Sequence, residues 1–482
     1  MENPTYPAQI AQAYARMAEL PPDPWRPAYH LSPLSGTLAD PDGLCQVGGV
    51  YHIFYVTNPL GCLTTQRTSC VWGHYSTRDF VHYRRETTAI FPDTARDRDG
   101  VYSGSALVDG DKLYLYYTGN VRHHGGFDYI HAGREQNVLR VESADGVHFT
   151  NKTLLLTNAD FPDWVTCHVR DPQMLRQDGQ VLMLLGARTQ ADEGCLLVYA
   201  SRDGVHFRHA HTVRTPEPFG YMWECPDYAC LNGQQLLLCS PQGIPHQAYE
   251  YQNAHQCGCL ELTGRLDAGA AAGAFHSFDY GFDFYAVRSL RAADGRTLLI
   301  AWMGMSEADY GRTPAAGHGW DQVIALPREL TWENGRPCQR PLRELRALRG
   351  ECQAAGCDAG AAWDSRRCEL VLHPQPGQDV SLHLFEDGLL SYDAAGKVLT
   401  LDLSGSCGAG RTVRRTKLDR LDTLDLFLDG SALEAFVNDG EAVLASRIFG
   451  QSSRVAAAPF AGRAEFYPMH PIVIEDCREH GV

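Results

Sequence analysis

The stretch Gly48-Gly-Val-Tyr-His-Ile-Phe-Tyr55 joins a two-glycine turn to a run of β-branched and aromatic residues. Such turns between apolar runs are the strongest short-range signal for a β-hairpin, because both central residues must tolerate a positive φ. The pattern recurs as Asp109-Gly110 before Lys112–Tyr117, Asp178-Gly179 before Val181–Leu185, Asn232-Gly233 before Leu236–Cys239 and Asp294-Gly295 before Thr297–Ala301. Successive turn glycines, starting from Gly49, are 61, 69, 54 and 62 residues apart.

This spacing leaves room for about four short strands in each repeat. A second motif lies between the turns, as Asp79-Phe-Val-His-Tyr83, Asp145-Gly-Val-His-Phe149 and Asp203-Gly-Val-His-Phe207. Radial repetition of four-stranded sheets is the β-propeller, so five repeats predict five blades. The alternative is a set of unrelated hairpins in a β-sandwich, which does not explain the near-constant period.

The remaining segments complete an all-β prediction: a five-bladed β-propeller followed by a C-terminal β-sandwich. We expect a short helix over Pro7–Leu20 within an N-terminal extension of residues 1–25, and the propeller over residues 26–335. The proline- and charge-rich stretch Trp332–Pro341 suggests a linker or an ordered crossing segment, and we assign the linker to residues 336–349. Residues 350–482 contain short β-prone runs, such as Val380–Phe385 and Leu424–Leu428, that are typical of a β-sandwich.

Composition excludes several classes of function. Lys plus Arg is 42 and Asp plus Glu is 58, so the net charge of −16 disfavours binding to nucleic acid. The longest apolar stretches, such as Val181–Leu185, are far shorter than the roughly 20 residues of a membrane span. The first 25 residues contain no apolar signal-peptide region, and the 16 cysteines have no regular spacing. We therefore expect a cytoplasmic protein with free thiols, in which His255, Cys257 and Cys259 lack a second ligand pair for zinc.

A polar cluster precedes each turn by a similar interval. The clusters centre on Asp40, Ser103, Asp171, Glu224 and Asp283, which lie nine, seven, eight, nine and twelve residues before the turn glycines. The innermost strand of a blade occupies this interval, so the clusters should converge at one end of the central channel. The aspartates of the turns, and Asp42, are expected to serve as turn residues only.

Crowded carboxylates repel one another, which raises the pKa of at least one of them and suits it to general acid catalysis. A pair of carboxyl groups flanking an acetal is what glycosidic bond cleavage requires. Neighbouring aromatic residues offer faces on which sugar rings stack; they are Trp72, Tyr102, Trp223, Phe284, Tyr285, Trp302 and Trp320. Two carboxyl groups suffice for this chemistry, so we expect no metal and no organic cofactor.

An ordered set of motifs matches a known family through nearly the whole chain. The set includes Asp40-Pro-Asp-Gly43, Tyr102-Ser-Gly-Ser105, Arg170-Asp-Pro172, Glu224-Cys-Pro226, Asp283-Phe-Tyr285, Ala301-Trp-Met-Gly304 and Phe436-Val-Asn-Asp-Gly-Glu441. On these residues the chain resembles glycoside hydrolase family 32, the invertases, sucrose-6-phosphate hydrolases and fructanases. The resemblance implies the same architecture, a five-bladed propeller with a β-sandwich.

The resemblance also implies roles. Asp40 would attack the anomeric C2 of a fructosyl unit, Glu224 would serve as acid/base, and Asp171 would stabilise the transition state. A small carbohydrate substrate would contact Trp72, Tyr102, Ser103, Arg170, Asp283, Tyr285, Trp302 and Trp320. Retention through a covalent intermediate requires the two reacting carboxyl groups about 5–5.5 Å apart.

Two residues depart from the family pattern. Ala39 and Val56 stand where the family usually has Asn and Gln, so two polar contacts to the fructosyl ring are missing. We therefore predict a preferred substrate larger or more charged than sucrose, held by rim residues such as His74, Arg96, His123 and His124. Alternatives are a transfructosylating enzyme, a non-catalytic fructan-binding propeller and, more weakly, an arabinoside-acting relative. The β-sandwich could mediate a homo-oligomer.

Overall fold

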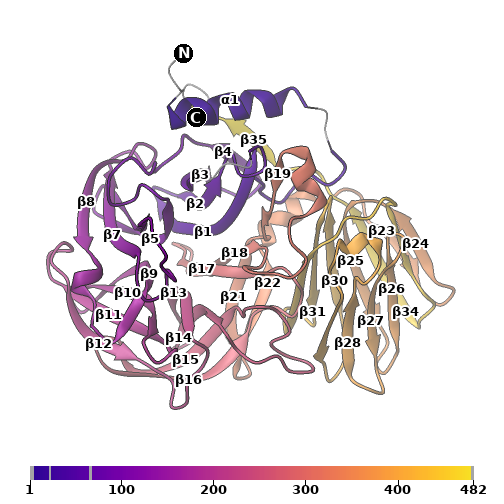
Figure 1. The fold of residues 1–482 in the computed structure, drawn as a ribbon. Helices are drawn as coiled ribbons and strands as arrows, with labels where there is room; N and C mark the ends of the chain where they lie inside the picture. The colour runs from indigo at the N-terminus through magenta and orange to yellow at the C-terminus, as the bar shows by residue number, and fades with distance from the viewer. Residues whose placement is uncertain (1–4, 21–22, 65–67, 479–482) are drawn as a thin grey trace.

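The computed structural model describes residues 5–20, 23–64 and 68–478, and strands make up most of them (Figure 1). More than the first half of the chain forms five sheets, and the first long strand of each sheet is its inner strand. The sheets are β1 (Gly36–Val47) to β4 (His82–Arg85), β5 (Val101–Asp109) to β8 (Thr150–Leu156), β9 (Val165–Gln177) to β12 (Arg208–Val213), β13 (Met222–Leu231) to β16 (Ala268–Ser277), and β17 (Tyr285–Arg291), β18 (Thr297–Met303), β20 (Val323–Ile324), β21 (Arg328–Glu333) and β22 (Arg336–Pro341).

The five inner strands form a closed ring. Strand β1 packs against β5, β5 against β9, β9 against β13, β13 against β17, and β17 against β1. This ring and its outward-directed sheets are the predicted five-bladed propeller. The turns are those read from the sequence: β9 pairs with β10 (Gln180–Thr189) across Asp178 and Gly179, whose φ values are 49° and 76°.

Two short strands tie distant parts of the chain to the first blade. Strand β19 (Trp320–Asp321) pairs in parallel with the start of β1, and β35 (Val473–Asp476) pairs in parallel with β4. Helix α1 (Tyr6–Ala18), which overlaps the predicted Pro7–Leu20, lies beside β35 at the edge of this blade (Figure 1). No helix among the described residues is both long and apolar enough to cross a membrane.

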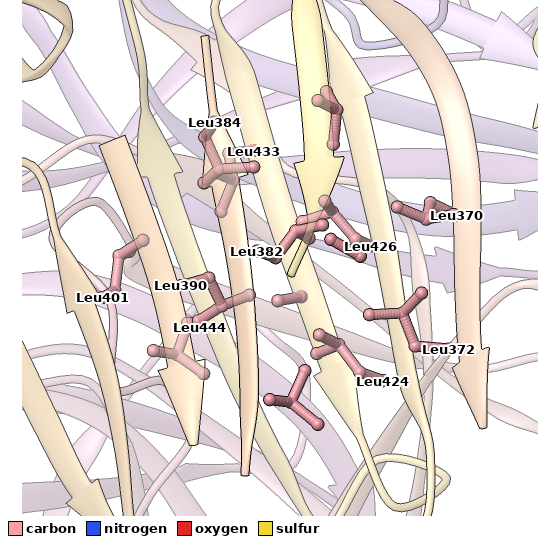
Figure 2. Close-up of a cluster of buried hydrophobic side chains, with 14 of the residues drawn as sticks. Leu370, Leu372, Leu382, Leu384, Leu390, Leu401, Leu424, Leu426, Leu433 and Leu444 are labelled. Atoms are coloured by element: carbon pink, nitrogen blue, oxygen red, sulfur yellow. The ribbon is translucent and has the colours of Figure 1, made fainter. Parts of the chain in front are cut away.

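The C-terminal part is a sandwich of two six-stranded sheets. One sheet contains β23 (Gln353–Gly356), β34 (Gly462–Pro468), β25 (Arg367–Pro374), β30 (Leu424–Asp429), β31 (Ala432–Val437) and β32 (Ala442–Arg447). The other contains β24 (Ala361–Asp364), β33 (Arg454–Ala457), β26 (Val380–Leu384), β27 (Gly388–Asp393), β28 (Val398–Asp402) and β29 (Val413–Lys417). Leucines at alternate positions, such as Leu382, Leu384, Leu424 and Leu426, fill the space between the sheets (Figure 2).

The strands place the boundaries differently from the sequence prediction. Strand β22 pairs with β21 along its whole length, so the predicted linker at residues 336–349 begins inside the fifth blade. The rest of that segment contains a short 3₁₀ turn, η3 (Arg343–Leu348), whose Leu345 and Leu348 are buried. Strand β35 likewise belongs to the first blade although it lies within the range assigned to the sandwich.

Candidate active site

Every inner strand of the propeller contains a register shift. The shifts fall at Leu38–Pro41, Tyr102–Gly104, Arg170–Gln173, Glu224–Asp227 and Tyr285–Arg288. Such bulges re-aim side chains that would otherwise alternate across the sheet. They fall on the clusters that the sequence singled out, with one exception in the fifth blade.

The bulges also link neighbouring blades through their backbone. The second residue of three of them has a positive φ: Asp171 at 64°, Cys225 at 49° and Ala286 at 53°. In this conformation the N–H of Asp171 donates to Thr118 Oγ1 and that of Cys225 donates to Asp171 Oδ2, both at 2.9 Å. The N–H of Ala286 donates to Ser240 Oγ at 3.1 Å. The ring thereby holds its polar side chains in fixed positions.

Asp40 lies in the bulge of β1 and is partly exposed. Its Oδ2 accepts a hydrogen bond from Ser103 Oγ at 2.5 Å and lies 3.6 Å from Cys225 Sγ. Three blades therefore contribute to its surroundings, and one of its oxygens is held by a hydroxyl donor. A carboxylate held in this way keeps one orientation, as an attacking nucleophile requires.

Glu224, at the start of β13, is surrounded by donors. Arg170 donates to Glu224 Oε1 from Nε at 3.1 Å and from Nη2 at 2.5 Å. Tyr285 Oη and Gln242 Nε2 donate to Oε2 at 2.7 and 2.8 Å. The side chain of Glu224 retains 16% of its exposure, so one edge of the carboxylate stays accessible.

The electrostatics of the carboxylates follow from burial and from two arginines. Burial raises the pKa of Asp40 to about 6, and the negative charges of Asp171 and Glu224 add to the effect. Burial also raises the pKa of Asp171, which Arg170 opposes. Burial acts to raise the pKa of Glu224, but the Arg170 guanidinium and the hydrogen bond from Tyr285 together outweigh it, so the pKa of Glu224 lies below its ordinary value.

Asp42 corrects the expectation that it is a turn residue. It is fully buried, accepts the N–H of Gly104 at 2.9 Å and lies 3.3 Å from Arg288 Nη2. Arg288 in turn donates to the carbonyl of Pro226, which joins the fifth blade to the fourth. Asp42 and Arg288 are therefore buried groups that join neighbouring blades, and burial raises the pKa of Asp42 well above its ordinary value.

The structure brings several predicted site residues together and separates others. Asp40, Ser103, Arg170, Asp171, Glu224 and Tyr285 are joined by the hydrogen bonds above. Trp302 packs edge-on against Tyr285, with ring centroids 6.4 Å apart, and is partly exposed. Tyr102 precedes Ser103 in the same bulge and is also partly exposed.

Asp283 lies apart from the other predicted sugar-binding residues. Its carboxylate accepts from Arg411 Nε and Nη2 at 2.6 and 2.8 Å and from the N–H of Arg447 at 2.8 Å. Both arginines belong to the sandwich, so Asp283 joins the two domains instead of contacting sugar. The bulge of the fifth blade carries Tyr285, two residues later.

Two of the predicted tryptophans are buried within the fold. The side chain of Trp320 is fully buried; its Nε1 donates to Asp23 Oδ2 at 2.7 Å and Arg26 stacks on its ring at 4.4 Å. Trp72 is equally buried and donates from Nε1 to the carbonyl of Tyr102 at 3.2 Å. Trp72 therefore supports the strand that carries Ser103, and neither ring is a sugar platform.

Sequence reasoning missed residues that complete the site. Cys225 was present in a quoted motif but received no role, and Gln242 and Arg288 carried no local signal. His255, Cys257 and Cys259 do not form a metal site; His255 Nε2 lies 3.2 Å from Glu307 Oε2. Within the described part of the chain, no three His, Cys, Asp or Glu residues are grouped to hold a metal ion.

Family comparisons agree with this geometry. The model of the glycosyl hydrolases family 32 N-terminal domain matches residues 30–341, and that of the family 32 C-terminal domain matches residues 352–467. The chain belongs to glycoside hydrolase family 32. Among similar proteins, the sucrose-6-phosphate hydrolase of Klebsiella pneumoniae is 38% identical over 90% of this chain and 92% of its own length. That of Bacillus subtilis is 34% identical over 92% and 91%.

Solved structures of family 32 members share the fold. The sucrose-6-phosphate hydrolase of Lactobacillus gasseri superposes with a TM-score of 0.85, 28% identity and coverage of 97% of both chains. A mutant of a Bombyx mori β-fructofuranosidase, solved in complex with sucrose, has a TM-score of 0.83 and 27% identity, with 98% of this chain and 100% of that one covered. The family 32 chain described here is accordingly a glycosidase of the β-fructofuranosidase class.

Proposed function

We propose that this protein hydrolyses sucrose 6-phosphate, releasing fructose by a double displacement with retention. The observation that carries the proposal is the convergence of Asp40, bound by Ser103, and Glu224, bound by Arg170 and Tyr285, at one end of the propeller ring. The choice of substrate is supported by relatives at 34–38% identity that are named sucrose-6-phosphate hydrolases.

In the proposed mechanism Asp40 attacks the anomeric C2 while Glu224 donates a proton to the glycosidic oxygen. The C2–oxygen bond breaks, the glucose moiety leaves as an alcohol, and an ester forms between C2 and Asp40. Glu224, now ionised, removes a proton from water, which attacks C2 and releases fructose and free Asp40. Asp171 and Arg170 stand beside these groups and can bind fructosyl hydroxyls.

The free protein favours the opposite proton distribution, because the pKa of Asp40 is raised and that of Glu224 is lowered. Arg170 is the main cause of the low pKa of Glu224. If a fructosyl hydroxyl draws Arg170 away, Glu224 loses a counter-charge in a buried site and its pKa rises. Substrate binding would then give Glu224 the proton that it must donate.

Transfer to a sugar acceptor and non-catalytic binding are less well supported. The similar proteins are named hydrolases, and one relative is the raffinose invertase of Escherichia coli, 34% identical over 92% of this chain. A binding module needs no acid/base group, yet Glu224 has four donor contacts. We also propose a cytoplasmic location, because all sixteen cysteines are unpaired, as in a reducing compartment.

The test is fructose release from sucrose, sucrose 6-phosphate, kestose, inulin and levan. We expect the highest kcat/KM on sucrose 6-phosphate, and a loss of several orders of magnitude in kcat for Asp40→Asn and Glu224→Gln. Asp111→Asn, an exposed turn substitution, is the matched control. With methanol as acceptor, retention predicts methyl β-fructofuranoside; the α-anomer, or near-native turnover of either variant, contradicts the proposal.

A further inference from the structure

A stripe of basic side chains extends from the acid/base on the second and third blades. We call Arg122, Arg134, His168 and Arg170 the basic stripe. Arg122 on β6 (Lys112–Arg122) and Arg134 on β7 (Arg134–Ser143) are direct cross-strand partners, so their side chains lie on the same face of the sheet. Arg134 Nη1 and His168 Nε2 are 3.0 Å apart.

The stripe is continuous with Glu224. Arg170 binds Glu224 and also donates from Nη1 to Gln136 Oε1 at 3.2 Å. Gln136 and Arg134 are two residues apart on β7 and therefore share a face, about 7 Å apart along the strand. Glu224 protonates the glycosidic oxygen in the proposed mechanism, so Arg170 and Gln136 connect the residue that protonates the leaving group to Arg134 and Arg122.

The outer arginines of the stripe have no side-chain ion pair in the described part of the chain, although Asp99 Oδ2 accepts the backbone N–H of Arg122 at 2.8 Å. In the described ranges, 5–20, 23–64 and 68–478, no carboxylate forms an ion pair with Arg122 or Arg134. Nε of both arginines and Nδ1 of His168 are buried without a hydrogen-bond partner there. The carboxylate of the neighbouring Glu135 interacts with the side chains of Arg96, His123 and Asn137. The carboxylate of Asp128 accepts a backbone N–H of the turn that it begins, that of His131.

Burial and the mutual repulsion of these basic groups also lower the pKa values of two members of the stripe, Arg134 and His168. Burial, together with Arg170 and Arg122, lowers the pKa of Arg134 to about 10. Burial, together with Arg170 and Arg134, lowers the pKa of His168 to about 2, so its ring is neutral. Buried arginines are ordinarily paired, and a cluster that repels itself is stabilised by an anion.

We propose that Arg122 and Arg134 bind the phosphate of the leaving sugar, with the hydroxyl of Tyr102 beside them. The inference rests on the proposed function, since it assigns the part of the site that recognises a phosphorylated glucose moiety. A guanidinium donates two parallel hydrogen bonds to a phosphate, which a lysine cannot do. Arg134, at 9% exposure, is preorganised by the sheet, while Arg122 is partly exposed and stacks on Tyr129 at 5.1 Å.

This assignment replaces the rim residues expected from the sequence. His74 is buried, stacked on Phe54 and bonded to His52. Arg96 and His123 both pair with Glu135. None of these three has an unsatisfied charge to offer a phosphate.

The kinetic test compares sucrose 6-phosphate with sucrose in Arg134→Gln, Arg134→Lys and Arg122→Gln. Loss of a charge-assisted hydrogen bond predicts a fall of about 10- to 150-fold in the ratio of the two kcat/KM values. Arg134→Lys should retain a higher ratio than Arg134→Gln, because a lysine keeps the positive charge but cannot donate two parallel hydrogen bonds to the phosphate. Arg96→Gln, an exposed arginine paired with Glu135, should leave the ratio within about two-fold.

A binding test separates this proposal from the proposed function. Calorimetric titration of the protein with glucose 6-phosphate, glucose and inorganic phosphate should show that glucose 6-phosphate binds most tightly and that Arg134→Gln weakens it. Binding that depends on Arg134, without turnover of sucrose 6-phosphate, upholds the site and rejects the function. The site is rejected if the ratio of kcat/KM on sucrose 6-phosphate to that on sucrose is the same in all arginine variants. It is also rejected if Arg134→Gln binds glucose 6-phosphate as tightly as the wild type does.

Discussion

Replacing Asp40 with asparagine should stabilise the fold while it abolishes turnover. The substitution keeps the shape and an oxygen that accepts from Ser103, and it removes a buried negative charge near Asp171 and Glu224. The folded protein holds the Asp40 proton with a pKa of about 6, against an ordinary value of 3.8. At about 1.4 kcal/mol per pH unit, the ionised carboxylate costs the folded state about 3 kcal/mol.

The sign of the pH dependence follows from the raised pKa. Between the two values the folded state binds more protons than the unfolded state, so the stability of the wild type falls as pH rises from 3.8 to about 6. The penalty is complete above pH 6 and absent below pH 3.8. Asp40→Asn should therefore be more stable than the wild type by about 1–3 kcal/mol at pH 7.5 and equally stable near pH 3.5.

Calorimetry at both pH values measures the effect. An unfolding entropy of about 2.1 cal/mol/K per residue gives about 1 kcal/mol/K for 482 residues, so the melting temperature should rise by about 1–3 °C at pH 7.5. Asp111→Asn, on the surface, should show no such change. A variant no more stable at pH 7.5, or a gain of the same size at pH 3.5, would refute the reasoning.

Three further outcomes are expected. Arg170→Gln should lower kcat and move the acidic limb of the kcat/KM profile to higher pH. That limb follows the lower of the two pKa values of the free enzyme, which belongs to Glu224, and the guanidinium no longer lowers it; an unmoved acidic limb contradicts this. Asp283→Asn should cost about 3–5 kcal/mol in urea unfolding by leaving buried Arg411 unpaired, with KM unchanged; a raised KM at unchanged stability would return Asp283 to the sugar site. Ala39→Asn should raise kcat/KM on sucrose about 2- to 10-fold, whereas Val56→Gln should mainly destabilise a buried position; equal stabilities of the two variants would count against that distinction.

The propeller could be predicted because its turns are local. Gly48-Gly49, Asp178-Gly179 and Asn232-Gly233 require only their own residues to adopt a positive φ, so the sequence shows them directly. The boundaries could not be predicted in the same way. Strands β22 and β35 are placed by pairing partners, and β35 joins a strand nearly four hundred residues earlier in the chain, for which the local sequence has no signal.

The contrast between local signals and long-range contacts also explains which site residues could be predicted. Asp40, Asp171 and Glu224 stood out because each bulge lies eight or nine residues before its turn. Asp283 lay twelve residues before the fifth turn, and the loop between β17 and β18 is longer than the two-residue turns elsewhere, so the bulge falls on Tyr285. Arg134 had no motif around it, because its importance arises from the absence of a partner in three dimensions.

The departures at Ala39 and Val56 and the basic stripe have a common explanation in how binding energy is distributed. Val56 is 7% exposed and pairs with Trp72 across the sheet, so this wall beside Asp40 is part of an apolar core and offers the fructosyl ring no amide. The neighbouring second blade carries two arginines, Arg122 and Arg134, that form no ion pair with a carboxylate in the described ranges and whose Nε atoms have no hydrogen-bond partner there. Energy gained from a remote charged group can hold the reacting bond in place as well as direct contacts to the ring do, provided the charge remains bound in the transition state. A phosphate on the leaving sugar fulfils that condition until the C2–oxygen bond is broken. A protein that uses the phosphate in this way would tolerate the loss of ring contacts that hydrolysis of unphosphorylated sucrose requires.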